Sequence, residues 1–341
     1  MAYKISIFNH KGGVSKTTTA FHLAWMFTEK NKRVLLVDAD SQCNLTLTVV
    51  GYEQYEDFHE KNPTQNIKDG LSPAFDSKPE LIKPIECVKA LSNDKLYLLP
   101  GSFDITEYEV QLGVSFQFSK SFSTMKNLPG AFNFLIEKTA EKYQADYVII
   151  DVNPSLSAIN QDLLISSDYF IVPASPDYFS KMAIKSLSRV LPIWERWAKQ
   201  AREIFANATY PLPQNPPKFL GFTINDFTLK SGQPATSFQK VINGIEQLVK
   251  DEMIPSFKSA DLLLDEKFYS NEYCIAKIPN FHTLVTRFQE YSTPVFLLTD
   301  EQIGSTGPVL EQQRTAKARF YDLFSMFADK LIKIIDDANS N

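Results

Sequence analysis

The sequence predicts an α/β fold with a mostly parallel, twisted sheet and helices on both faces. Short apolar runs without polar alternation recur along the chain, as in strands that are buried on both sides. Stretches with helical spacing separate these runs, and several of the runs end on an acidic residue. A strand, a helix and a second strand within about 35 residues form a βαβ unit, whose ligand site lies at the carboxyl ends of its strands.

The expected strands are the apolar runs, and the expected helices are the stretches with apolar residues every three to four positions. The strands are 5–8, 33–37, 96–101, 146–151, 169–173, 219–225 and 274–278. The helices are 17–30, 131–143, 181–202, 237–250 and 314–335, with a helical turn at 67–71. We expect Pro192 to break or kink its helix, because proline lacks the N–H that the helix needs. Residues 116–126, rich in Ser and Phe, are expected to form a loop or a mobile helix.

Length and composition indicate a globular chain. The 341 residues allow two domains or one α/β domain with insertions. We expect one domain over 1–341, with insertions at about 52–93 and 226–270 and a C-terminal helical extension at about 300–337. The chain is 44% hydrophobic and 22% charged, which is ordinary for a protein with a sizeable core.

Charge, cysteines and hydropathy exclude several classes. The net charge of −5 does not indicate a nucleic-acid binder, although a local basic face is compatible with it. The cysteines at 43, 87 and 274 lie far apart and form no C-x-x-C pair, so neither a zinc site nor a disulfide framework is indicated. No apolar run of 18 residues occurs and the N-terminus resembles a strand, so we expect a cytoplasmic protein.

The segment His10–Thr18 has the glycines, lysines and hydroxyls of a phosphate-binding loop. It lies between an expected strand and an expected helix, where backbone N–H groups and the helix dipole favour an anion. Lys16 is expected to contact the β- and γ-phosphates and the Thr17 hydroxyl to ligate Mg²⁺. The residues expected around the nucleotide phosphates are Gly12, Gly13, Val14, Ser15, Lys16, Thr17 and Thr18.

This loop departs from the common G-x-x-x-x-G-K-[ST] pattern, because His10 and Ser15 stand where that pattern has glycine. It carries a second lysine, Lys11, at the loop entrance. The form K-G-G-x-x-K-T-T resembles the deviant P-loop of the ParA/MinD ATPases. The resemblance implies a P-loop NTPase fold that binds ATP and Mg²⁺. It also implies an ATP-dependent homodimer in which Lys11 reaches the partner's phosphates.

Carboxylates at two strand ends are candidates for catalysis and for metal binding. Asp38 and Asp40 begin a segment that resembles the first switch of that family, D-x-D-x-Q-x-N. We expect Asp40 to orient the attacking water, with Asp38 as the alternative or as a supporting hydrogen-bond partner. Asp151 ends an apolar run as in a Walker B strand, and Thr17, Asp40 and Asp151 are the expected magnesium residues. The family's D-x-P-P continues here with Asn153 in place of one proline, which predicts a less stiff second switch.

Two further residues match base-pocket positions of the family. Pro279, which leaves the last expected strand, matches a position beside the adenine, and Asn225 matches, less closely, one that reads the base. A strand terminator or a turn residue is the alternative for both.

Two basic clusters and the last helix suggest surfaces for partners. Relatives bind nonspecific DNA through surface lysines and arginines, and such phosphate contacts weaken steeply with salt. A solvated helix face is the alternative for both clusters. The final helix is expected to pack on the sheet and not to bind a membrane, because an acidic end follows it. The clusters are Lys181, Lys185 and Arg189, and Arg314, Lys317 and Arg319.

The resemblance as a whole implies a positioning ATPase that hydrolyses Mg-ATP slowly and is stimulated by a ParB-like or other partner. Such a protein partitions DNA or other cargo. The alternatives are a nucleotide-gated adaptor without turnover and a metabolic or electron-transfer enzyme on the same scaffold. The three scattered cysteines count against the iron-protein type of the latter.

Overall fold

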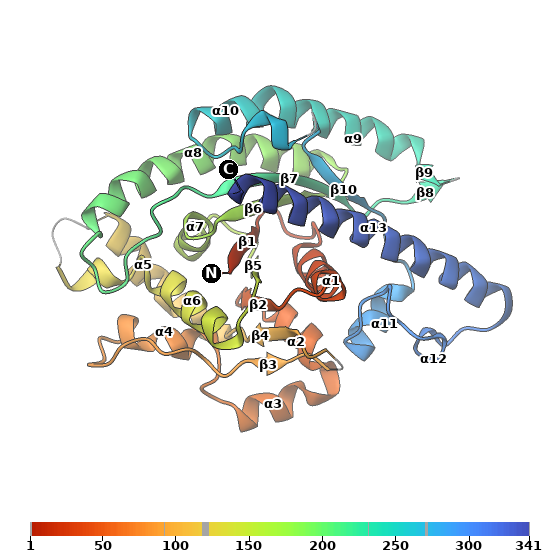
Figure 1. The fold of residues 1–341 in the computed structure, drawn as a ribbon. Coiled ribbons are helices and arrows are strands. Elements are labelled where there is room, and N and C mark those ends of the chain that lie inside the picture. The colour runs from red at the N-terminus through yellow and green to blue at the C-terminus, as the bar shows by residue number, and fades with distance from the viewer. Residues whose placement is uncertain (1, 92, 118–122, 231, 270–271, 341) are drawn as a thin grey trace.

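The computed structural model describes all residues except 1, 92, 118–122, 231, 270–271 and 341. Its centre is an eight-stranded sheet in the order β10-β7-β6-β1-β5-β2-β4-β3 (Figure 1). Neighbouring strands are parallel except β3 with β4, which confirms the predicted α/β fold. The strands are β1 (Tyr3–Ile7), β2 (Val34–Ala39), β3 (Val88–Lys89), β4 (Leu96–Leu99), β5 (Tyr147–Val152), β6 (Tyr169–Ala174), β7 (Lys218–Asn225) and β10 (Cys274–Ile278), with a separate hairpin of β8 (Leu229–Lys230) and β9 (Gln233–Pro234).

Helices cover both faces of the sheet (Figure 1). On one face lie α1 (Lys16–Glu29), α2 (Asn44–Val50), α11 (Leu284–Tyr291), α12 (Asp300–Ile303) and α13 (Gly307–Asn339). On the other lie α4 (Ile67–Phe75), α5 (Glu107–Gln117), α6 (Ala131–Tyr143), α7 (Ala158–Ile165), α8 (Tyr178–Ile204), α9 (Thr236–Leu248) and α10 (Ile254–Ser259). The short α3 (Tyr55–Lys61) follows α2 along the chain.

Alternation along the strands divides the core in two. Leu35 and Val37 of β2 belong to the cluster under α4–α10, whereas Val34 and Leu36 belong to the cluster under α1 and α13. Every residue of β2 is buried, as expected for a strand with helices above and below it. This double burial explains why the central strands read as continuous apolar runs in the sequence.

The helix α8 runs through Pro192, so the break is not found, whereas the kink stays a prediction. Proline removes the N–H that would donate to the carbonyl of Ser188, four residues earlier. The hydroxyl of Ser256 in α10 donates to that carbonyl instead, at 2.5 Å. A neighbouring helix therefore supplies the hydrogen bond that the proline removes.

Other expectations differ in extent. The turn expected at 67–71 is the longer helix α4, and α9 continues through a π-helical turn, Val249–Met253, into α10. Of residues 116–126, the first two complete α5 and 123–126 begin a 3-10 turn, whereas 118–122 lie outside the described residues. The description of the chain as one domain with two insertions stays a prediction.

The long C-terminal helix α13 packs on the sheet, as expected. Its repeated apolar residues are buried against α1 and β10. Within the described parts of the chain, no helix is both long and apolar enough to cross a bilayer. The buried residues are Phe320, Phe324, Phe327, Ala328, Leu331, Ile334 and Ile335.

Candidate functional site

The phosphate loop lies at the carboxyl end of β1, at the middle of the sheet, and leads into α1. Gly13 has a φ of +70° and Ser15 a φ of 60°, so both adopt left-handed backbone conformations. The Asn9 side chain fixes the loop's entrance, because its amide donates to the carbonyl of Pro173 at 2.8 Å and its oxygen accepts from the N–H of Lys11 at 2.9 Å. The loop is therefore held open and tied to the end of β6.

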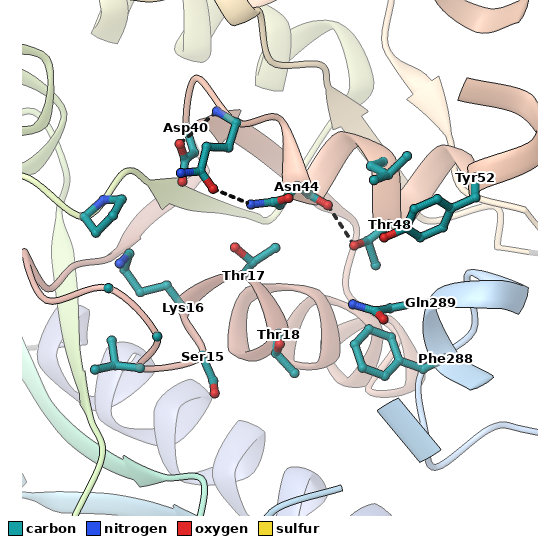
Figure 2. A pocket seen from close by; sticks show the side chains of 16 residues that line it. Ser15, Lys16, Thr17, Thr18, Asp40, Asn44, Thr48, Tyr52, Phe288 and Gln289 are labelled. Atoms are coloured by element: carbon teal, nitrogen blue, oxygen red, sulfur yellow. Dashed lines mark hydrogen bonds between the residues drawn. The ribbon is translucent and has the colours of Figure 1, made fainter. Parts of the chain in front are cut away.

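A cleft of about 340 Å³ opens over this loop (Figure 2). Its floor consists of Gly12, Gly13, Val14, Ser15, Lys16, Thr17 and Thr18. Asp40, Gln42, Asn44 and Pro154 line it beside the loop, and Leu47, Thr48, Tyr52, Phe288 and Gln289 line its outer end. All seven residues expected around the phosphates thus share one cleft with Asp40.

Lys16 is buried at this floor, and its ammonium donates to the carbonyl of Lys11 at 3.3 Å. Burial lowers the pKa of Lys16, whereas the nearby carboxylates of Asp151 and Asp40 act in the opposite direction. A desolvated ammonium with few protein partners gains most from an anionic ligand in the cleft.

Asp38 and Asp40 have different environments although they are two residues apart. Asp38 is fully buried, and one of its oxygens accepts from the Thr46 N–H and the Thr46 hydroxyl, both at 2.7 Å. Burial raises the pKa of Asp38 to about 6. Asp40 lines the cleft, and among the described residues its side chain accepts only from the N–H of Gln42, at 3.0 Å. Asp38 thus anchors the start of α2, and Asp40 is the carboxylate that faces a ligand.

Asp151 is a fully buried carboxylate in register with Ile7 of β1 and Asp38 of β2. Neither of its oxygens has a hydrogen-bond partner among the described residues. Burial and the charge of Asp38 raise the pKa of Asp151 to about 8, and the Thr17 hydroxyl partly offsets this. A buried carboxylate without partners beside Thr17 and Asp40 suits a bound cation or its water shell.

The loop after Asp151 is held by one side chain from α7. The Asn160 amide donates to the carbonyls of Asn153 and Ser155, both at 2.8 Å, and lies 3.0 Å from the Asn153 side-chain oxygen. Glu109 of α5 accepts from the first N–H groups of α7, including that of Ile159 at 3.2 Å. Asn160 therefore holds a loop in which Asn153 replaces one proline, and the lower stiffness of this loop stays a prediction.

Lys11 does not line the cleft of its own chain. Its ammonium pairs with Asp177, the residue that caps α8, at 2.9 Å. The other oxygen of Asp177 accepts from the N–H of Ser180 at 2.7 Å. Although burial acts to raise it, these hydrogen bonds hold the pKa of Asp177 below its usual range.

The two expected base-pocket residues do not line the cleft. Asn225 is buried beneath the loop, and its amide donates to the Val14 carbonyl at 2.9 Å and the Thr19 hydroxyl at 3.1 Å. Its side-chain oxygen has no partner among the described residues, and its role and that of Pro279 stay predictions.

Three of the side chains at the cleft's outer end, Tyr52, Phe288 and Gln289, have no signal in the sequence. Phe288 and Gln289 belong to α11, far from the loop along the chain (Figure 2). No local pattern could have identified them, because only the fold brings α11 beside α1.

The two basic clusters differ in how far their charges are paired. Arg314 forms ion pairs with Asp300, at 2.5 Å, and Glu311, and Lys317 donates to the carbonyl of Leu298 at 2.6 Å. On α8, Lys185 lies 3.4 Å from Glu252. Each cluster thus has one residue in ion pairs with carboxylates, and in the α13 cluster a second residue, Lys317, is held by a carbonyl.

The chain is similar in sequence to a known protein family and to several known proteins. A family model described as an AAA domain matches residues 2–203. The chain is 31% identical over 244 residues to the uncharacterized protein MJECL24 of Methanocaldococcus jannaschii, which covers 72% of this chain and 79% of that protein. It is 31% identical over 187 residues to the sporulation initiation inhibitor protein Soj of Bacillus subtilis, covering 55% of this chain and 62% of Soj.

Solved structures share the fold. Protein DIP2308 from Corynebacterium diphtheriae superposes with a TM-score of 0.67 at 22% identity, covering 86% of this chain and 97% of that one. The ParA of pNOB8, solved bound to nonspecific DNA, gives a TM-score of 0.58 at 19% identity and 99% coverage of both chains. With its two-lysine phosphate loop and its match to the family model over residues 2–203, the chain belongs to the ParA-type P-loop ATPases.

Proposed function

We propose that this protein is an ATP-dependent, dimerising ATPase that acts as a nucleotide-driven switch to partition or position DNA or other cargo. It hydrolyses Mg-ATP slowly, and a ParB-like or other partner protein stimulates it. The observation that carries the proposal is that the two lysines of the loop are placed differently. Lys16 lies in the cleft, whereas the Lys11 ammonium pairs with Asp177 outside it.

The cleft suits a nucleoside triphosphate. The loop N–H groups and Lys16 neutralise the β- and γ-phosphates at the start of α1, where the helix dipole also favours an anion. The outer end of the cleft offers Phe288 and Gln289 as an apolar and a polar contact for ribose or base. Asn225 and Pro279 are the base contacts that the family pattern suggests.

The donor set also suits magnesium. Thr17, Asp40 and Asp151 would hold the ion or its waters, and the partnerless oxygens of Asp151 support this assignment. The ion, when bound, neutralises charge on the β- and γ-phosphates. Asp40 faces the cleft and would orient the attacking water, whereas the hydrogen bonds of Asp38 commit it to a supporting role.

A second subunit would supply positive charge that one subunit does not place around the γ-phosphate. Phosphoryl transfer requires position and positive charge around the γ-phosphate. Lys11 of a second copy, facing this cleft, would supply that charge as an arginine finger does in other P-loop enzymes. Hydrolysis then removes the group that holds the two copies together.

The proposed cargo contact is nonspecific DNA on the basic face of α8. The incompletely paired charges there support it, as does the related ParA that was solved bound to nonspecific DNA. Binding through phosphates alone weakens steeply with salt and reads no sequence.

The test is Lys11→Ala, with light scattering and phosphate release measured in Mg-ATP. We expect the wild type to dimerise only with ATP, and Lys11→Ala to lose dimerisation and turnover while it still binds nucleotide. The matched control is Lys30→Ala, because Lys30 forms a comparable pair with Asp329 at 2.7 Å far from the cleft. A Lys11→Ala protein that dimerises normally would refute the trans-lysine.

Phosphate release with and without duplex DNA tests the remainder. Nucleotide-driven dimerisation without phosphate release would indicate an adaptor instead of an ATPase. Retention of DNA at low salt only when ATP is present supports the positioning role over a metabolic enzyme on this scaffold.

A further inference from the structure

The contact between Lys11 and Asp177 joins the phosphate loop to the first turn of α8. Two further contacts make the same connection: the Asn9 amide donates to the Pro173 carbonyl at 2.8 Å, and the Ser175 hydroxyl donates to the Gly13 carbonyl at 3.4 Å. The turn between β6 and α8 is thus fastened to the loop at three points. Of these three contacts, the one between Lys11 and Asp177 is the one that involves a charged side chain of the loop.

Asp177 makes two separable contacts. One oxygen caps α8 through the N–H of Ser180 at 2.7 Å, and the other accepts from the Lys11 ammonium at 2.9 Å. The carboxylate side chain is 40% exposed and that of Lys11 is 18% exposed. Water therefore reaches the pair and weakens it, so that a more highly charged ligand can displace the carboxylate.

We propose that Asp177 is a positioning residue that holds Lys11 within its own subunit until a partner's triphosphate takes the lysine over. This inference rests on the proposed function, in which Lys11 acts across the dimer. The side chain of Lys11 points to its own α8 while it is paired, so the contact must open before the ammonium can reach a second copy. A triphosphate carries several negative charges, whereas Asp177 carries one. The Lys11 ammonium should therefore leave Asp177 for the triphosphate when both are within reach.

This arrangement sets a threshold for dimerisation. Breaking the pair in each subunit costs free energy that ATP-driven association must supply. For a pair as exposed as this one, the cost corresponds to about two- to fivefold per subunit, or about four- to 25-fold in the dimer dissociation constant. Asp177 therefore weakens the ATP-driven dimer by this factor.

The substitution Asp177→Asn separates the two contacts. Asparagine caps a helix as well as aspartate does, so the bond from the Ser180 N–H is kept while the charge that holds Lys11 is removed. Asp329→Asn is the matched control, because it removes the carboxylate that pairs with Lys30 from α13, outside the cleft, while the Ser325 hydroxyl stays beside that ammonium.

Two measurements test the proposal. In light scattering with saturating Mg-ATP, Asp177→Asn should tighten the dimer by about four- to 25-fold, whereas Asp329→Asn should equal the wild type. In the nucleotide-free monomer, reductive methylation followed by mass spectrometry should modify Lys11 about two- to fivefold faster in Asp177→Asn. Asp329→Asn should accelerate only Lys30.

The outcomes are distinct. If the wild type forms an ATP-dependent dimer and Asp177→Asn forms one that is no tighter, or if Lys11 is modified no faster, the holding role is wrong and the proposed function stands. If the wild type itself fails to dimerise with ATP, the proposed function fails. A tighter dimer together with faster modification of Lys11 supports Asp177 as the residue that restrains the lysine.

Discussion

At the scale of single residues, the phosphate loop holds a serine in a conformation that suits glycine. Ser15 has a φ of 60° and a ψ of 38°, and its position is the one that glycine occupies in the common loop pattern. For a residue with a Cβ, this conformation costs about 1–2 kcal/mol. The side chain lines the cleft and makes no hydrogen bond to the described residues, so the hydroxyl does not compensate for the strain there.

We expect Ser15→Gly to stabilise the nucleotide-free protein by about 0.5–1 kcal/mol, because relief of the left-handed strain exceeds the entropy that glycine adds to the unfolded chain. Urea unfolding without nucleotide measures it. Ser77→Gly is the control, since Ser77 has a φ of 52° on an exposed turn away from the cleft and should gain a similar amount. A loss of ATP affinity in Ser15→Gly alone would indicate that the hydroxyl serves the nucleotide. Unchanged or lower stability would contradict the strain argument.

The sequence predicts residues of this site where a local pattern contains the chemistry. The loop residues and Asp40 meet in one cleft because strand, loop and helix follow one another directly. Tyr52 and Phe288 also line this cleft, but they lack such a signal. They arrive by tertiary packing, which spacing along the chain does not encode.

At the scale of elements, α8 illustrates what a single segment cannot reveal. Pro192 has no N–H, so the carbonyl of Ser188 lacks its usual helical hydrogen bond. The compensating hydroxyl of Ser256 lies on α10, which packs against α8. The sequence predicts the lost backbone hydrogen bond, whereas the Ser256 hydroxyl that replaces it becomes visible only in the fold.

The element that holds the second switch is α7, through Asn160. We expect Asn160→Ala to lower the free energy of unfolding by about 1–3 kcal/mol, because it removes two hydrogen bonds, to the half-buried carbonyls of Asn153 and Ser155, that contribute about 0.5–1.5 kcal/mol each. Hydrogen exchange in residues 153–157 should accelerate at the same time, as measured by mass spectrometry. The control is Asn243→Ala at an exposed position of α9. It should change the free energy of unfolding by no more than about 0.5 kcal/mol and leave the exchange of residues 153–157 unchanged. Unchanged exchange in Asn160→Ala would show that Pro154 alone stiffens this loop.

At the scale of the whole molecule, His22 ties the nucleotide-binding helix to the C-terminal part of the chain. Its Nδ1 lies 2.8 Å from the Thr18 carbonyl, and its Nε2 accepts from the N–H of Val295 at 3.1 Å. The acceptance by Nε2 assigns the hydrogen to Nδ1 and requires a neutral ring. Burial among the rings of Phe281 and Phe324 lowers the pKa of His22 to about 3.

Two buried groups, Asp151 of β5 and His22 of α1, therefore have opposite effects on stability as pH changes. Asp151 has a pKa of about 8 in the folded protein and about 3.8 when unfolded, so the folded state binds the extra proton and gains stability as pH falls below about 8. His22 takes up a proton in the unfolded chain near pH 6.5 but in the folded protein only near 3. Its contribution is complete above about pH 6.5 and is lost as the pH falls towards 3.

We expect the unfolding free energy of the nucleotide-free wild type, relative to Asp151→Asn, to rise by about 1–2 kcal/mol between pH 8.5 and 6.5, since asparagine takes up no proton. Below pH 6.5 the loss from His22 offsets part of the gain from the buried carboxyls of Asp151 and Asp38, so the wild type should gain less stability per pH unit than His22→Phe. Urea unfolding in EDTA measures these profiles, with Asp57→Asn on exposed α3 as the control that follows the wild type. Mg-ATP should remove the rise above pH 6.5 in the wild type, because a cation beside Asp151 keeps it ionised. Parallel profiles for the wild type and Asp151→Asn would mean that Asp151 is already ionised in the empty cleft, and the cation site argued from its partnerless oxygens would lose its support.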